Sequence, residues 1–90
     1  MMYPFMTLED NTEIVHSHML DDRRVKVYIE RPDAELGFRH ATCFIPGYTW
    51  EDIEGFTETE IAEFQEIIES TAHLIIEFSQ QGGFANAAGF

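Results

Sequence analysis

The strongest structural signal in the chain is FTETEIAEFQEIIESTAHLIIEFSQQGG, residues 56–83. Thr57 is followed three residues later by Glu60, which is the capping box that begins a helix: each side chain can bond to the backbone amide of the other residue. The glycine pair at 82–83 is a typical helix end. The segment therefore predicts one helix over residues 58–81, about 36 Å long at 1.5 Å per residue.

The apolar residues of this segment lie on one side of the predicted helix. At about 100° per residue, one arc contains Ile61, Phe64, Ile67, Ile68, Thr71, Ala72, Leu74, Ile75 and Phe78. A one-sided apolar arc is typical of a helix that packs on one face of a sheet. The opposite arc is acidic and contains Glu63, Glu66, Glu69 and Glu77.

The chain before residue 47 has the alternation of strands. In residues 23–30, RRVKVYIE, apolar side chains alternate with polar ones, and turn-forming residues separate this segment from its neighbours. We expect the strands to lie at 3–8, 12–20, 23–30 and 38–45, whereas residues 48–55, YTWEDIEG, indicate an acidic connector. The sequence thus predicts an α+β fold: a three- to four-stranded antiparallel sheet followed by one long C-terminal helix packed on one face.

Length and composition predict a single domain. The 90 residues, 44% of them hydrophobic, are enough for one α+β domain over residues 1–90. The Gly/Ala-rich end, GGFANAAGF at 82–90, is expected to be a flexible tail. The start of the chain lacks the pattern of a signal peptide, and no apolar run approaches a membrane span. We therefore expect a soluble, cytoplasmic protein.

The charge of the chain is strongly negative and unevenly placed. The formal net charge is −12, from 17 acidic and five basic residues. All five basic residues lie between positions 23 and 39, together with three of the 17 acidic residues, so fourteen carboxylates lie outside this window. Such a molecule repels nucleic acids and anionic membranes, which makes direct binding to either unexpected. The same field attracts a basic protein.

An acidic surface is the first candidate site. The candidate partner-binding residues are Glu63, Glu66, Glu69 and Glu77 on the helix, with Asp21, Asp22, Glu51, Asp52 and Glu54 before it. The helix presents one charge per about 6 Å of length, whereas duplex DNA carries one per about 1.7 Å. The helix alone is therefore too sparse to mimic a nucleic acid, and the remaining carboxylates would have to join the same surface.

Histidines form the second candidate site, a metal site. His16 and His18 lie one residue apart in EIVHSHMLDD, residues 13–22, and would share one side of a strand. Neutral imidazoles suit zinc and iron, with His40 as the possible third ligand. His40 alternates with a different set of neighbours, however, and nothing in the sequence marks the two faces as the same one. We expect two partly exposed strand histidines, no metal and no cofactor, with a metal-dependent enzyme as the less favoured alternative.

The sequence contains no pattern of nucleophilic catalysis. Cys43 is the only cysteine and lies in ATCFI, an apolar strand, which is typical of an inert buried thiol. A phosphate-binding glycine loop precedes a helix, whereas the glycine pair here follows one. We expect a protein that is not an enzyme.

Two segments carry a resemblance to known proteins. MYPFMTLEDNTEIVHS, residues 2–17, and IIESTAHLIIEFSQQGGFANA, residues 67–87, resemble small acidic proteins of bacterial mobile elements and accessory regions. This resemblance implies accessory roles such as antitoxin, inhibitor of a nuclease or regulator of a nucleic-acid enzyme. It implies no site residues.

Two functional hypotheses follow. The first is an acidic module that engages a basic protein surface, as an inhibitor, an antitoxin or a nucleic-acid mimic. The alternative is a homodimeric structural or regulatory module whose acidity serves solubility, with Tyr48 and Trp50 forming the contact.

Overall fold

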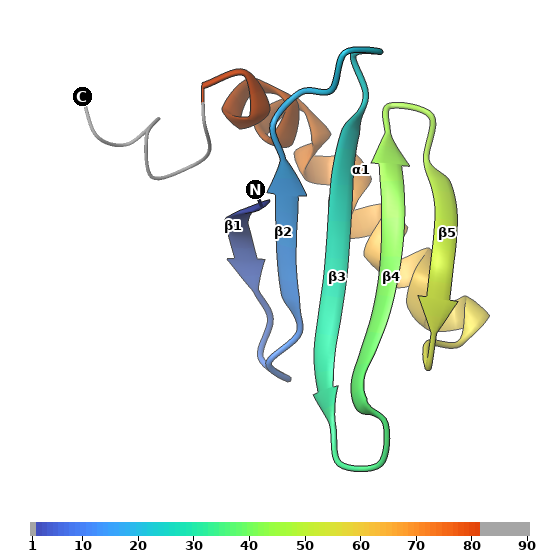
Figure 1. Cartoon of the computed structure of the whole chain (residues 1–90). Coiled ribbons are helices and arrows are strands. Elements are labelled where there is room, and N and C mark those ends of the chain that lie inside the picture. Colours follow the sequence, from blue (N-terminus) through green and yellow to red (C-terminus); the bar gives the residue numbers. More distant parts are fainter. Residues whose placement is uncertain (1, 82–90) are drawn as a thin grey trace.

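The computed structural model describes residues 2–81 and contains one antiparallel sheet and one helix (Figure 1). The strands are β1 (Met2–Thr7), β2 (Glu13–Ser17), β3 (Val25–Asp33), β4 (Gly37–Ile45) and β5 (Thr49–Glu54), and the helix is α1 (Glu58–Gln81). They pair in the order β1-β2-β3-β4-β5, so each strand lies beside its neighbours in sequence. The predicted α+β class is confirmed, but with five strands rather than three or four. The predicted tail at 82–90 lies outside the described residues.

The fifth strand occupies the segment that the sequence indicated as a connector. Glu51, Asp52 and Glu54 are residue types that strands disfavour. Asp52 has a φ of 53°, in the left-handed region, and the pairing of β5 with β4 shifts register at this point. β5 is therefore a bulged edge strand that depends on pairing with β4 and has little strand signal of its own.

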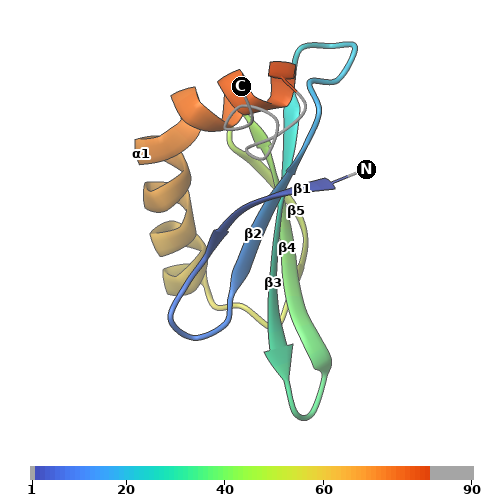
Figure 2. The ribbon, with the colours of Figure 1, turned by 90° about the vertical axis from the view of Figure 1, so that its left-hand side faces the viewer.

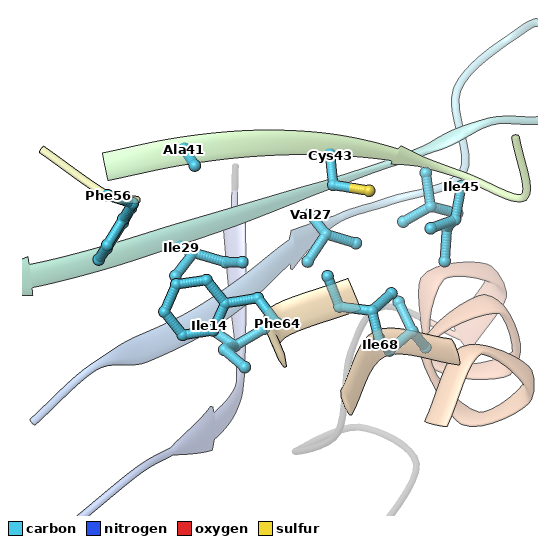
Figure 3. Packing of buried hydrophobic residues seen from close by; sticks show 11 residues of the cluster. Ile14, Val27, Ile29, Ala41, Cys43, Ile45, Phe56, Phe64 and Ile68 are labelled. Carbon is cyan, nitrogen blue, oxygen red and sulfur yellow. The ribbon is translucent and has the colours of Figure 1, made fainter. Parts of the chain in front are cut away.

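The core lies between α1 and one face of the sheet (Figure 2). Alternate residues of β2, β3 and β4 point toward Phe64 and Ile68 of the helix, as Figure 3 shows. The buried apolar residues are Ile14, Val25, Val27, Ile29, Ala41, Cys43, Ile45, Phe56, Phe64, Ile68 and Ile75. Burying one large aliphatic or aromatic side chain contributes about 1.5–3 kcal/mol, so this layer supplies the main stabilisation of the fold.

The helix begins where the capping box predicts. The Thr57 amide donates to Glu60 Oε1 at 2.9 Å, and the Glu60 amide donates to Thr57 Oγ1 at 3.1 Å. The predicted bounds of the helix, 58–81, are confirmed. None of the described helices is long and apolar enough to cross a membrane.

Arg31 joins three parts of the fold at the start of the helix. Its Nε donates to Thr12 Oγ1 at 2.8 Å, and its two terminal nitrogens pair with Asp10 and Glu60, both at 2.8 Å. The guanidinium also lies 5.2 Å from the ring centroid of Phe56, within cation–π range. Arg31 thus ties the β1–β2 turn and β3 to the first turn of α1.

Both carboxylates of this cluster are stabilised in the charged form. The hydrogen bond from the Thr12 hydroxyl, followed by the Thr12 amide and Arg31, lowers the pKa of Asp10. The Thr57 amide, followed by Arg31, lowers the pKa of Glu60. Glu60 therefore caps the helix and holds Arg31 with the same carboxylate.

Replacing Arg31 tests this connection. Arg31→Ala should lower the free energy of unfolding by roughly 2 kcal/mol, because it leaves Asp10 and Glu60 without their cation and removes packing on Phe56. For a domain of this size, that loss lowers the melting temperature by roughly 10 °C.

Arg39→Ala is the matched control, since Arg39 carries the same charge, has a more exposed side chain and pairs with one carboxylate, Asp33, rather than two. We expect it to cost less than about 1 kcal/mol. Equal melting temperatures for the two variants, measured by circular dichroism, would refute the structural role of Arg31.

Candidate functional site

The outer face of α1 is a continuous acidic surface, called here the helix acidic face. It consists of Glu58, Glu63, Glu66, Glu69 and Glu77, all exposed to solvent. Glu58 and Glu77 are about 28 Å apart along the helix axis. Among residues 2–81, the ion pairs of the protein involve none of these glutamates.

The basic residues lie elsewhere in the fold. α1 contains no Lys or Arg, and every basic residue belongs to β3, β4 or the loop before β3. Arg24 pairs with Asp22 and Arg39 pairs with Asp33, while Arg31 reaches only the inward edge of the helix at Glu60. The helix acidic face therefore receives no charge compensation from the described cations.

This arrangement is electrostatically unfavourable for the helix itself. Glu63, Glu66 and Glu69 are spaced three residues apart, where like charges repel one another. The last turn has no basic residue, so nothing there complements the negative end of the helix dipole, which Glu77 approaches. Except for Glu58, which lies in the first turn where a negative charge is favourable, the glutamates of this face thus lower the stability of α1.

The structure does not bring the remaining predicted carboxylates to this face. Asp21 and Asp22 lie in the loop between β2 and β3, which bends away from α1 in Figure 2. Asp22 accepts hydrogen bonds from the amide and Nε of Arg24, and these bonds lower the pKa of Asp22. This pair therefore forms a separate, locally compensated acidic turn.

Glu51 and Glu54 of β5 point toward the face of the sheet turned away from α1. Glu51 lies across from Thr42, and Glu54 lies across from His40 and accepts from its Nε2 at 3.0 Å. His40 stacks on Tyr28, which alternates with the helix-facing residues of β3. Asp52 forms the bulge between them. The nine predicted carboxylates therefore do not form one surface: four lie on the helix acidic face, two in the acidic turn and three in β5.

The predicted aromatic contact is engaged within the fold. Trp50 Nε1 donates to Gln65 Oε1 of α1 at 2.9 Å, which places the indole on the helix side of the sheet. Tyr48 and Trp50 both pack against the core and are only partly exposed. Because both side chains already make contacts within the fold, neither exposes enough surface to form the main contact with a partner.

The three histidines lie apart. His16 is on the helix side of β2, His18 is exposed beyond the end of β2, and His40 is on the other face of the sheet. The expectation that His16 is partly exposed is wrong, because the rings of Tyr3 and Phe5 from β1 cover it. Within the described part of the chain, no group of three or more His, Cys, Asp or Glu residues could hold a metal ion.

Cys43 is buried in the core, as predicted. Burial raises the pKa of its thiol to about 12, so the thiolate that a nucleophile requires does not form near neutral pH. Residues 2–81 enclose no pocket.

The sheet face turned away from α1 is a second extended surface, which was not among the predicted sites. Its centre is Tyr28, whose ring stacks on His40 with centroids 6.2 Å apart. Phe44 lies on the same face, with the Arg24 guanidinium 4.3 Å from its ring centroid. No element within residues 2–81 covers this face (Figure 2). In the sequence, the residues of β3 that alternate with its buried positions, Lys26, Tyr28 and Glu30, were the signal for this face.

Comparison of the chain with protein-family models, curated proteins and solved structures finds no match in any of the three. The resemblance to small acidic accessory proteins therefore stays a prediction. Function is therefore inferred from the geometry of the surfaces described above.

His16 makes the stability of the fold depend on pH. Its Nδ1 bonds to the Ser17 carbonyl at 2.8 Å, while its buried Nε2 has no hydrogen-bond partner among the described residues. Burial lowers the pKa of His16 below 6.5, an effect that the Ser17 carbonyl partly offsets. An unfolded chain has the ordinary histidine pKa of about 6.5. As the pH falls through that pKa, the unfolded chain binds a proton before the folded chain does, so acid favours unfolding.

We therefore expect the free energy of unfolding to decrease from about pH 7 to about pH 5, above the range in which carboxylates titrate. His16→Phe should remove most of this decrease, whereas His73→Gln, at an exposed helix position, should keep it. Urea denaturation at each pH measures the effect. A wild-type stability that is flat across this range would contradict the buried, neutral state of His16.

Proposed function

We propose that this protein is a cytoplasmic, non-catalytic module that binds a basic protein surface through the helix acidic face. The observation that supports this most is the row of exposed glutamates on a helix without Lys or Arg, uncompensated by the described cations. Residues that cost local stability without an internal gain are typical of functional surfaces. A cationic partner would relieve the repulsion within the helix.

The spacing of the glutamates favours recognition of a protein over imitation of duplex DNA. One charge per about 6 Å of helix is sparse beside the phosphates of a duplex, and the carboxylates of β5 and of the Asp21–Asp22 turn do not add to the helix acidic face. A row of this length suits a lysine- or arginine-rich helix or groove. Occupying such a surface is how an inhibitor or an antitoxin acts, and the resemblance noted above agrees with such a role.

Neutralising three glutamates tests the proposal. The triple variant Glu63→Gln, Glu66→Gln and Glu69→Gln keeps helix propensity nearly unchanged and removes mutual repulsion, so its stability should equal or exceed that of the wild type. Its binding to a basic partner should weaken at least tenfold, because the charges that steer and hold the partner are gone. Binding by the wild type should itself fall steeply with salt.

The matched control variant is Glu9→Gln, Glu35→Gln and Glu51→Gln, which changes the net charge equally at exposed positions outside α1. The measurement is affinity capture from extracts of the source cell, eluted by a salt gradient, with the three proteins compared. We expect a protein that the wild type and the control retain and the helix variant loses. Equal retention of this partner by all three proteins would refute the proposal. A partner that the helix variant retains and a Trp50→Ala variant loses would also refute it.

A further inference from the structure

The uncovered sheet face has opposite charges at its two ends. Along β3, Lys26, Tyr28 and Glu30 point to this face, and they pair with Phe44, Thr42 and His40 of β4. Arg24, over the ring of Phe44, joins Lys26 at one end. Glu13 and Glu54, which flank Glu30 and His40 in the pairing register, make the other end acidic. The partly exposed ring of Tyr28 lies between the two ends, in one row with Thr42 and Glu51.

We infer that this face binds a second copy of the same chain, face to face, about a two-fold axis that crosses the strands near Tyr28. The rotation reverses the strand direction, so Lys26 of one copy lies over Glu30 of the other, and the reverse contact forms at the same time. A surface with a basic end, an aromatic centre and an acidic end is complementary to itself under this operation, except at Glu51, which meets its own copy at the rim formed by β5. Sheets that pack in this way lie about 10 Å apart, within reach of lysine and glutamate side chains.

The sheet edges are less suited to self-association. β1 contains Pro4, which cannot donate a backbone hydrogen bond, and its pairing shifts register between Pro4 and Met6. β5 is bulged at Asp52 and has further carboxylates on each side of the bulge. Prolines, bulges and charges are the features that prevent edge strands from pairing with another chain. The face of the sheet therefore remains as the self-complementary surface.

The size of the face and the net charge are compatible with such a dimer. Five strands about 4.8 Å apart and up to nine residues long give a footprint on the order of 600 Å², near the roughly 800 Å² per partner of stable complexes. The two α1 helices would lie on the outer sides, about 30 Å apart. This exceeds the screening length of about 8 Å at physiological ionic strength, so their glutamates scarcely repel one another.

Charge reversal tests the orientation directly. Lys26→Glu and Glu30→Lys should each raise the dimer dissociation constant at least tenfold, because each creates like-charge contacts at both symmetry-related positions. The double variant Lys26→Glu/Glu30→Lys restores opposite charges across the interface and should return the constant to near its wild-type value. Sedimentation equilibrium between about 1 μM and 1 mM chain measures it, and circular dichroism confirms folding.

The helix variant Glu63→Gln/Glu66→Gln/Glu69→Gln should dimerise like the wild type, which separates this inference from the proposed function. A wild type that stays monomeric throughout would overturn the inference and leave the face to residues 82–90 or to another protein. A dimer that neither reversal weakens would also overturn it, since association would then use another surface. Weakening by both single reversals without recovery in the double variant would contradict the proposed orientation.

Discussion

A single helix must bury the apolar face of a five-stranded sheet, and the rest of the structure depends on this constraint. α1 is the only helix within residues 2–81, so its inner side must be apolar along its whole length, while its outer side meets solvent. Arg31 fixes the first turn of the helix to both β3 and the β1–β2 turn, which sets where the helix crosses the sheet. The helix covers one face of the sheet, and no described element covers the other face.

This two-layer arrangement separates the charges of the chain. The cations lie in and beside β3 and β4, where they pair with nearby carboxylates or border the uncovered sheet face. Apart from Glu60, which pairs with Arg31, the glutamates of α1 form no ion pair with the described cations. The molecule therefore has one uniformly acidic surface and one surface of mixed charge, and the two proposals assign a different partner to each. The two surfaces are compatible with one another, since a face-to-face dimer would keep both acidic helices on its outer sides, each open to a partner of its own.

The sequence predicts those features that depend on local signals. The capping box and the apolar period define α1 to the residue. Alternation reveals β3 because one of its faces is buried and the other is not, although the strand runs over Val25–Asp33 rather than residues 23–30. β5 was missed because its acidic residues and left-handed Asp52 oppose strand formation, which only pairing with β4 overcomes. The burial of His16 was missed for a similar reason, since the covering rings come from β1. The helix glutamates were found, but the separation of the other carboxylates depends on strand register, which no local pattern specifies.

The central claim is that the helix acidic face recognises cations. The most direct measurement is a titration of ¹⁵N-labelled protein with a lysine-rich peptide, followed by amide chemical shifts at low and at high salt. The account predicts that the shifts concentrate at and around Glu63, Glu66, Glu69 and Glu77 and disappear as salt screens the charges. Shifts concentrated instead on β5 and around Tyr28, with the amides of α1 unmoved, would contradict it.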